Sequence, residues 1–192
     1  MRLRLDYGSN GLEAELPDDR ITVIEPIHRT AVADPRDALR QALRSPMGRG
    51  PLAGSVRLGQ RVAISVCDIT RAQPRQAMLE ALFDEIPEIP GRDVTILIAT
   101  GTHRTNTREE LERMLGRAIL ERCRVVNHDC RDGSSLESIG RTSTGVPVLL
   151  NREWLAADVR ITTGFVEPHF FAGFSGGPKM IAPGLAGLET VM

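Results

Sequence analysis

Lysine is almost absent from this sequence. Of its 24 lysine and arginine residues, only residue 179 is lysine, and every other basic position is arginine. The two side chains replace each other where only a solvated positive charge is needed, but arginine cannot replace a nucleophilic amine. Because the lone lysine lies in a stretch rich in glycine and phenylalanine, we interpret Lys179 as a candidate for amine-specific or covalent chemistry. The alternative is a leftover surface lysine.

Other features are also scarce, and each scarcity disfavours a class of protein. The three cysteines form no CxxC pair, which favours free thiols over a disulfide framework or a zinc site. A net charge of −1 without a basic run argues against nucleic acid or an anionic membrane as the partner. No apolar run approaches the ~18 residues of a membrane span, and the N-terminus lacks the apolar core of a signal peptide. We therefore expect a cytoplasmic protein.

The rest of the composition is that of an ordinary globular domain. The 192 residues are 41% hydrophobic and 26% charged, which is enough for one good core. We expect a single N-terminal α/β domain over residues 1–192, with a peripheral β ribbon at about 1–30. The chain stops at Met192 inside a predicted helix with no cap or polar tail. This ending predicts a fragment whose C-terminal domain is absent.

Four short apolar runs alternate with helical patterns. The runs cover residues 61–67, 94–99, 124–128 and 158–163, and their composition is typical of strands buried on both faces. Helices are predicted over 35–44, 75–86, 117–122 and 151–157 and after residue 107, with a hairpin over 136–150. Alternation at 1–6 and 11–25 predicts the small antiparallel ribbon. The fold class is therefore α/β, with an open, mainly parallel, Rossmann-like sheet flanked by helices.

Chemically informative residues follow the ends of these predicted strands. In open α/β sheets, ligands bind outside the carboxyl ends of the strands. Asp68-Ile69-Thr70-Arg71 follows the first strand, Gly101-Thr102-His103-Arg104 the second, His128-Asp129 the third, and the 164–184 stretch the fourth. This common position is stronger evidence for a site than any one of the motifs alone.

The residue types indicate roles for some of these positions. The guanidinium of Arg71 suits a carboxylate or phosphate, and Asp68 suits a histidine or a ribose hydroxyl; the alternative is a capping aspartate beside a surface arginine. His103, in the first turn after a strand, is a candidate for acid–base catalysis. We interpret His128 as structural and His28 as exposed.

The glycines before Lys179 do not form a phosphate-binding P-loop. That motif needs glycine before the lysine and a hydroxyl after it, whereas this chain has Pro178 and Met180. The backbone N–H groups of Gly176 and Gly177 still suit an anion.

The motifs together resemble the nickel-dependent lactate racemase family. Residues 164–179 read Gly-Phe-Val-Glu-Pro-His-Phe-Phe-Ala-Gly-Phe-Ser-Gly-Gly-Pro-Lys, and they follow Asp-x-Thr-Arg and Gly-Thr-His-Arg in the family's order. The long motif is specific, whereas the two short ones are weak alone. The resemblance covers about residues 60–192, which is part of the first of that family's two α/β domains.

The resemblance implies a cofactor and a reaction. Members of the family use a nickel-pincer nucleotide, a pyridinium bis-thiocarboxylate mononucleotide, joined by a thioamide to the lysine that matches Lys179. A hydride leaves the α-carbon of a 2-hydroxy acid for the pyridinium ring and returns to the opposite face. The two histidines that exchange the hydroxyl proton match His103 and His169. The segment Asp68 to Arg71, including Ile69 and Thr70, is implied to lie at the cofactor and substrate.

Hydride transfer needs a dry pocket, and the phenylalanine cluster at 165–174 is our candidate for its wall. Enzymes that make the cofactor are implied as partners.

Two departures from the family pattern affect these expectations. The family usually has proline directly after Asp-x-Thr-Arg, whereas this chain has Ala72-Gln73-Pro74, which predicts a differently shaped loop. The family's histidine ligand to nickel is expected beyond Met192, so we expect no metal ligand in this chain and no activity from it alone. Two other hypotheses remain: a non-catalytic domain that binds an anion or nucleotide, and a hydrolase that uses His103 and His169 around another metal.

Overall fold

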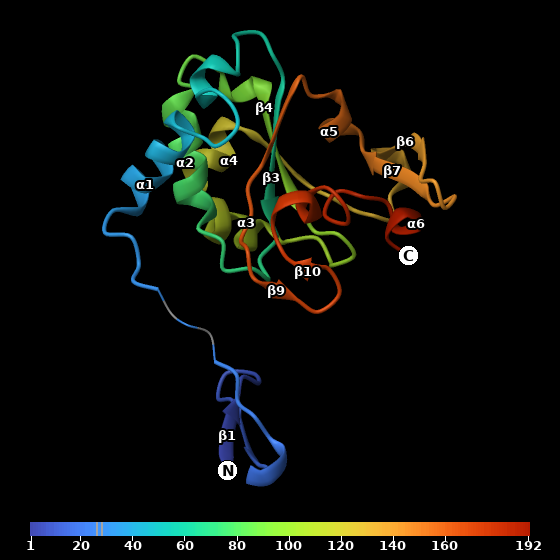
Figure 1. The fold of residues 1–192 in the computed structure, drawn as a ribbon. Coiled ribbons are helices and arrows are strands. Elements are labelled where there is room, and N and C mark those ends of the chain that lie inside the picture. Colours follow the sequence, from blue (N-terminus) through green and yellow to red (C-terminus); the bar gives the residue numbers. More distant parts are fainter. Residues whose placement is uncertain (26, 28) are drawn as a thin grey trace. The chain divides into compact units, whose positions relative to one another are not determined.

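The computed structural model describes residues 1–25, 27 and 29–192, and it divides into two compact units, Met1–Ala33 and Asp34–Met192 (Figure 1). In the first unit, β1 (Arg2–Leu5) pairs antiparallel with β2 (Leu12–Glu15). The prediction of strand up to residue 25 is wrong. Pairing ends at Glu15, because Pro17 has no N–H to donate and the 3-10 turn η1 (Asp18–Arg20) follows it. His28 lies outside the described residues.

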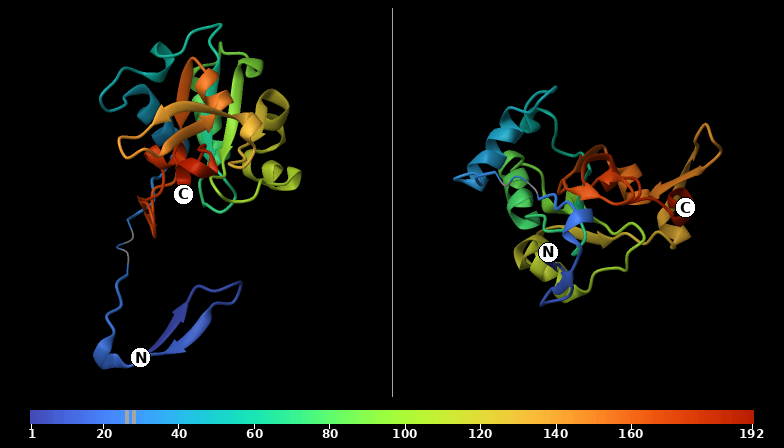
Figure 2. Two further views of the ribbon diagram at one scale, coloured as in Figure 1. Left: turned by 90° about the vertical axis from the view of Figure 1, so that its right-hand side faces the viewer. Right: turned by 60° about the horizontal axis from the view of Figure 1, so that its bottom comes forward.

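A four-stranded parallel sheet forms the centre of the second unit. It contains β3 (Val62–Cys67), β4 (Val94–Ala99), β5 (Arg124–Asn127) and β8 (Val159–Thr162), in the order β5-β4-β3-β8 (Figures 1 and 2). The predicted open parallel sheet is therefore confirmed. Only β3 and β4 have the expected burial on both faces, whereas β5 and β8 are partly exposed because they are the edges.

Alternate residues of the inner strands enter two different cores. Val62, Ile64 and Val66 belong to the larger core, which is covered by α1 (Pro35–Arg44), α2 (Arg75–Glu85), α3 (Arg108–Leu115) and α4 (Arg117–Arg122). Ala63 and Leu97 face the smaller core, where they meet Trp154 of α5 (Arg152–Ala156) and Leu185. Successive side chains of a strand point to opposite faces of the sheet. Helices α1 to α4 cover one face, and α5 with the C-terminal segment covers the other (Figure 1).

The local signals for helices and turns hold in the structure. Asp34 caps α1 by accepting from the Asp37 N–H, and Thr107 caps α3 in a reciprocal box with Glu110. The predicted hairpin is β6 (Leu136–Arg141) with β7 (Pro147–Asn151), against which α6 (Leu188–Val191) packs. The remaining short elements are η2 (Leu52–Gly54), η3 (Gly91–Asp93), η4 (Gly133–Ser135), β9 (Pro168–His169), β10 (Gly173–Phe174) and η5 (Gly177–Met180).

The strand order places the site. From β3 the chain adds β4 and β5 on one side and then crosses to add β8 on the other. The order therefore reverses between β3 and β8, and at such a switch point the loops leave the sheet in opposite directions and open a crevice. The loops after β3 and β8, which carry Asp68–Arg71 and residues 164–179, leave the sheet on the two sides of this switch point.

Candidate functional site at the carboxyl edge of the sheet

A buried carboxylate holds one of the two predicted histidines. Asp68 directly follows β3 and its side chain is only 5% exposed, and its Oδ2 lies 2.7 Å from the Nδ1 of His103, which is half exposed. The other oxygen, Oδ1, accepts from the backbone N–H and the hydroxyl of Thr70. Because an ionised carboxylate only accepts hydrogen bonds, the proton of neutral His103 is on Nδ1, and its Nε2 lone pair is free.

A buried arginine shapes the loop that carries Asp68. The Arg75 guanidinium donates to the backbone carbonyls of Cys67 at 2.7 Å, Gln73 at 3.2 Å, Arg71 at 2.7 Å and also Asp68. Arg75 is 7% exposed, and burial lowers its pKa. The guanidinium acts as the centre around which residues 67–73 turn, so it fixes where the Asp68 carboxylate lies.

Gln73 ties this turn to the neighbouring strand. Its amide oxygen accepts from the Cys67 N–H at 2.8 Å, and its amide nitrogen donates to the Thr163 hydroxyl at 2.8 Å, just after β8. The Thr163 hydroxyl in turn donates to the carbonyl of Ser65. The departure from the family pattern at Ala72-Gln73-Pro74 therefore gives a loop closed by a buried side-chain amide.

The stretch after β8 folds back over the sheet through specific backbone contacts. The Ser65 hydroxyl donates to the Met180 carbonyl at 3.0 Å, and the Gly101 N–H donates to the Gly184 carbonyl at 3.0 Å. Gly164 and Gly176 touch directly, because a Cβ on Gly164 would lie 2.8 Å from the Gly176 Cα. These contacts bring η5, which carries Lys179, over the carboxyl ends of β3 and β4.

The second predicted histidine lies on a small hairpin. His169 ends β9, and its Nδ1 accepts from the backbone N–H groups of Phe171 at 3.3 Å and Ala172 at 3.2 Å. Partial desolvation and the charges of Lys179 and Arg71 lower the pKa of His169, and His103 contributes a smaller effect of the same sign. Lys179, Arg71 and His103 therefore lie close enough to His169 for their charges to lower its pKa.

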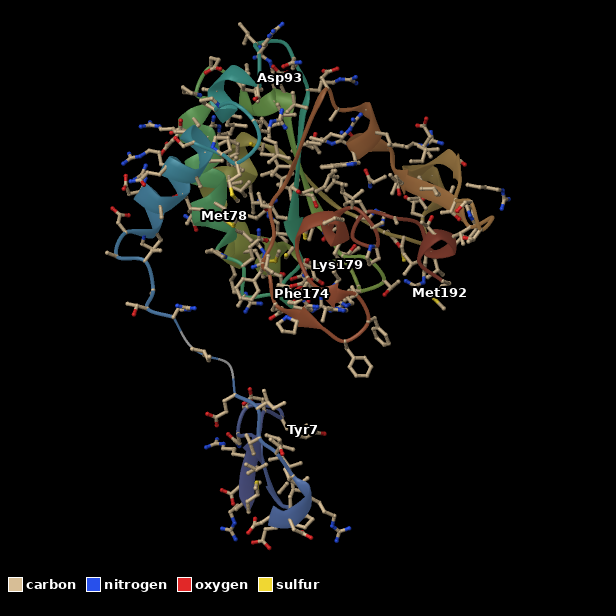
Figure 3. The ribbon with its side chains drawn as sticks, viewed as in Figure 1. Tyr7, Met78, Asp93, Phe174, Lys179 and Met192 are labelled. Carbon is tan, nitrogen blue, oxygen red and sulfur yellow. The ribbon has the colours of Figure 1, made fainter. Side chains whose placement is uncertain are left out.

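The phenylalanine cluster does not form the expected dry wall within this chain. Phe170, Phe171 and Phe174 are 93%, 89% and 64% exposed, and that expectation is wrong for the described residues. Phe170 and Phe171 contact each other edge to face with ring centroids 5.0 Å apart. The hairpin that carries them projects from the carboxyl edge of the sheet of the second unit (Figure 3).

Arg71 and Lys179 supply the positive charge of the edge. The Arg71 Nε lies 3.1 Å from Glu167 Oε1, so this ion pair joins the loop after β3 to the loop after β8. Desolvation and the charge of Arg71 lower the pKa of Lys179, which is partly buried in η5 (Figure 3). Gly177, two residues earlier, has φ +51° with no heavy atom within 4 Å of where a Cβ would be, so there is open space beside Gly177.

Ile69 is placed differently from the other predicted residues. Its side chain packs against the larger core, and it lines a groove of about 590 Å³ beside α2 and α3 together with Arg113 and Met114. The remaining predicted residues, Asp68, Thr70, Arg71, His103, His169 and Lys179, come from the loops after β3, β4 and β8. Within residues 1–25, 27 and 29–192, no group of three or more His, Cys, Asp or Glu side chains is placed to bind a metal ion.

Sequence reasoning missed three residues that shape this edge: Gln73, Arg75 and Glu167. Arg75 has the pattern of a surface arginine in the first turn of a helix, and nothing local shows that its guanidinium turns inward. His128 is structural as predicted: it is fully buried, its Nε2 contacts the Ala186 carbonyl at 2.9 Å, and burial lowers its pKa. In the described residues no helix is both long and apolar enough to cross a membrane.

The four-stranded parallel sheet, whose strand order reverses between β3 and β8, places the chain in the class of Rossmann-like α/β domains. The family model described as the lactate racemase N-terminal domain matches residues 7–192. The chain belongs to this family, and the match extends the resemblance well before residue 60.

Two curated relatives and two solved structures agree with this assignment. The chain is 34% identical to a lactate racemase of Thermoanaerobacterium thermosaccharolyticum over 99% of its length and 46% of the relative's. It is 35% identical to a lactate racemase of Lactiplantibacillus plantarum, over 82% of the chain and 37% of the relative.

The structure of the lactate racemase apoprotein from T. thermosaccharolyticum superposes with a TM-score of 0.81 at 34% identity, covering all of this chain and 45% of that one. A crystal structure of a protein from Thermotoga maritima gives a TM-score of 0.64 at 25% identity, over 81% of this chain and 38% of that one. The chain thus spans less than half the length of the relatives it matches.

Proposed function

We propose that this chain is the part of a 2-hydroxy acid racemase or epimerase that carries the cofactor-attachment lysine and the two acid–base histidines. The observation that carries the proposal is that His103, His169 and Lys179 lie on the loops after β4 and β8, at the carboxyl edge of the sheet in a lactate racemase family domain, with His169 in the field of the other two. Lactate is the substrate named for the relatives, and we propose a 2-hydroxy acid of this type here.

The residues at the edge fit a nickel-pincer nucleotide. When bound, that cofactor accepts a hydride on its pyridinium ring and gives it back. Lys179 is the only amine side chain in the sequence, and its lowered pKa increases the neutral, nucleophilic fraction needed for a covalent link. The Arg71 guanidinium offers donors for a phosphate or carboxylate. The nickel-binding histidine lies outside this chain in the proposal, and cofactor-making enzymes of the cytoplasm are the proposed partners.

The two histidines exchange the hydroxyl proton of the substrate. When hydride leaves the α-carbon, the hydroxyl O–H bond breaks and the proton moves to the free Nε2 of His103, whose positive charge the buried Asp68 carboxylate stabilises. His169 serves the opposite enantiomer. Arg71 pairs with the substrate carboxylate in place of, or together with, Glu167.

Mass spectrometry on Lys179 tests the proposal. The full-length protein that contains this chain, produced together with cofactor-making enzymes, is expected to carry a nucleotide-sized adduct on the peptide that contains Lys179, with nickel bound in proportion. Lys179→Arg is the matched control, because it keeps the charge and removes the nucleophile, and it should carry neither. An unmodified Lys179 without nickel would contradict the racemase proposal.

A second candidate function is non-covalent binding of an anion or nucleotide. The open space beside Gly177 and the Arg71 guanidinium favour it. In that case a mononucleotide should bind equally well to the chain and to its Lys179→Arg variant, and no adduct should form.

A further inference from the structure

Both proposed acid–base histidines have Nδ1 engaged, but in opposite roles. In His103, Nδ1 points at the Asp68 carboxylate, so Nδ1 carries the proton and Nε2 holds a free lone pair. In His169, Nδ1 accepts from the Phe171 and Ala172 N–H groups, which occupies the Nδ1 lone pair. A neutral imidazole has one proton, so that of His169 is on Nε2. The two rings are therefore held in opposite tautomers.

This tautomer prevents His169 from taking a proton at the nitrogen that remains free. Nε2 already carries a hydrogen, so it donates a hydrogen bond but cannot act as a base. Protonation at Nδ1 is also disfavoured, because the new N–H would face two N–H donors of the turn. The charged groups around the ring act in the same direction: Lys179, Arg71 and His103 disfavour the imidazolium, and only Glu167 favours it.

We propose that the turn Phe170–Ala172 is a latch, which holds His169 as a neutral Nε2–H donor and must open before His169 transfers a proton. This inference rests on the proposed function, because it concerns the same site. Once the turn opens, Nδ1 can take a proton from solvent water while Nε2 releases its own. The Nε2 lone pair then accepts the substrate hydroxyl proton, breaking the O–H bond and forming an N–H bond.

The turn has few contacts that oppose opening. Phe170 and Phe171 are 93% and 89% exposed, so no buried packing is lost when they move. The β9–β10 ladder has only two residue pairs, His169 with Gly173 and Pro168 with Phe174. The base of the hairpin is better held, because the Ser175 N–H donates to the Glu167 carbonyl at 2.9 Å. The tip can therefore change while its base stays in place.

Nitrogen-15 NMR of the chain itself at neutral pH tests the latch. Two-bond proton–nitrogen correlations identify the tautomer of each ring, and the four histidines are assigned through single His→Gln variants. One net hydrogen bond changes such a ratio by roughly 2- to 10-fold. With two donors, His169 should favour Nε2–H by at least about 4-fold, whereas His103 should favour Nδ1–H.

A pair of substitutions at residue 172 isolates the backbone donor. Ala172→Pro removes one N–H group, and the Nε2–H preference of His169 should fall by roughly 2- to 10-fold. Ala172→Gly keeps the N–H and is the control, with an unchanged ratio. His103 should keep its tautomer in both variants, because its partner is Asp68.

The outcomes are separable from those of the racemase proposal. His169 in the Nδ1–H tautomer in the unsubstituted chain, or equal changes in the proline and glycine variants, would overturn the latch. The measurement on the unsubstituted chain decides the matter if the proline variant does not fold. The NMR measurement uses the chain without cofactor, so its result does not depend on modification of Lys179. An unmodified Lys179 would therefore refute the racemase proposal and leave the tautomer result intact.

Discussion

Replacing Arg75 with methionine should destabilise the second unit and release the loop that carries Asp68. Each of the four carbonyls loses a charged donor, and a hydrogen bond to a charged group contributes about 1.5–3 kcal/mol. Because all four partners are neutral carbonyls, the substitution also removes the cost of burying an unpaired charge, which is several kcal/mol. The difference leaves a loss of about 2–4 kcal/mol in the free energy of unfolding.

Urea denaturation followed by circular dichroism measures this loss. With a slope of about 2 kcal/mol per molar urea, the midpoint should fall by about 1–2 M. Arg71→Met is the matched control in the same loop, because the Arg71 guanidinium has an ion pair with Glu167 and only long contacts to Thr70, at 3.3 Å. It should lose less than about 1 kcal/mol. A loss below about 0.5 kcal/mol for Arg75→Met, or equal losses for both variants, would refute the role assigned to Arg75.

The remaining predictions concern the other buried polar groups. Asp68→Asn should release the Nδ1–H preference of His103 in the NMR measurement, and in an active protein containing this chain it should lower kcat by roughly 100-fold or more. His128 should make stability fall as the pH drops, because burial lowers the pKa of His128 in the folded state and the unfolded chain then binds a proton that the folded chain does not. The stability that is present above the unfolded-state pKa is lost towards lower pH, with a slope of up to about 1.4 kcal/mol per pH unit. His128→Gln should remove this slope. Ser175→Ala should cost about 1–2 kcal/mol, measured by urea denaturation, because the hydroxyl joins the carbonyl of Phe165 to the N–H of Glu167; an unchanged midpoint would contradict this bridge.

The sequence predicts local structure well where the signal is local. The apolar runs that become β3 and β4 are buried on both faces, and Asp34 and Thr107 begin helices through their own side chains. The order of the strands is not a local property. The strand order brings the loops after β3 and β8 side by side. The sequence alone offered only the general rule that ligands bind at the carboxyl ends of the strands.

The contacts that define the site join residues far apart in the chain. Asp68 and His103 are both visible in the sequence, but the 2.7 Å contact between them depends on how two loops leave neighbouring strands. The phenylalanine cluster shows the opposite case. Its apolar side chains predicted a dry wall, but the rings of Phe170, Phe171 and Phe174 are exposed, because composition does not say which other surface covers a loop. A buried arginine such as Arg75 is equally invisible, since its partners are backbone carbonyls without a sequence signature.

The site combines a rigid half with an exposed half, and this difference explains why its two histidines are held so differently. His103 is held by a carboxylate whose loop is fixed by Arg75 and Gln73, and these side chains are buried and tied to β3 and β8. The Nδ1 of His169, by contrast, accepts from two N–H groups of an exposed turn. A reaction that needs a proton acceptor for each enantiomer would therefore find His103 ready, and would depend on movement of the hairpin for His169. Conditions that open the turn should therefore change kcat for the enantiomer whose hydroxyl proton His169 accepts. The affinity for either enantiomer should change less.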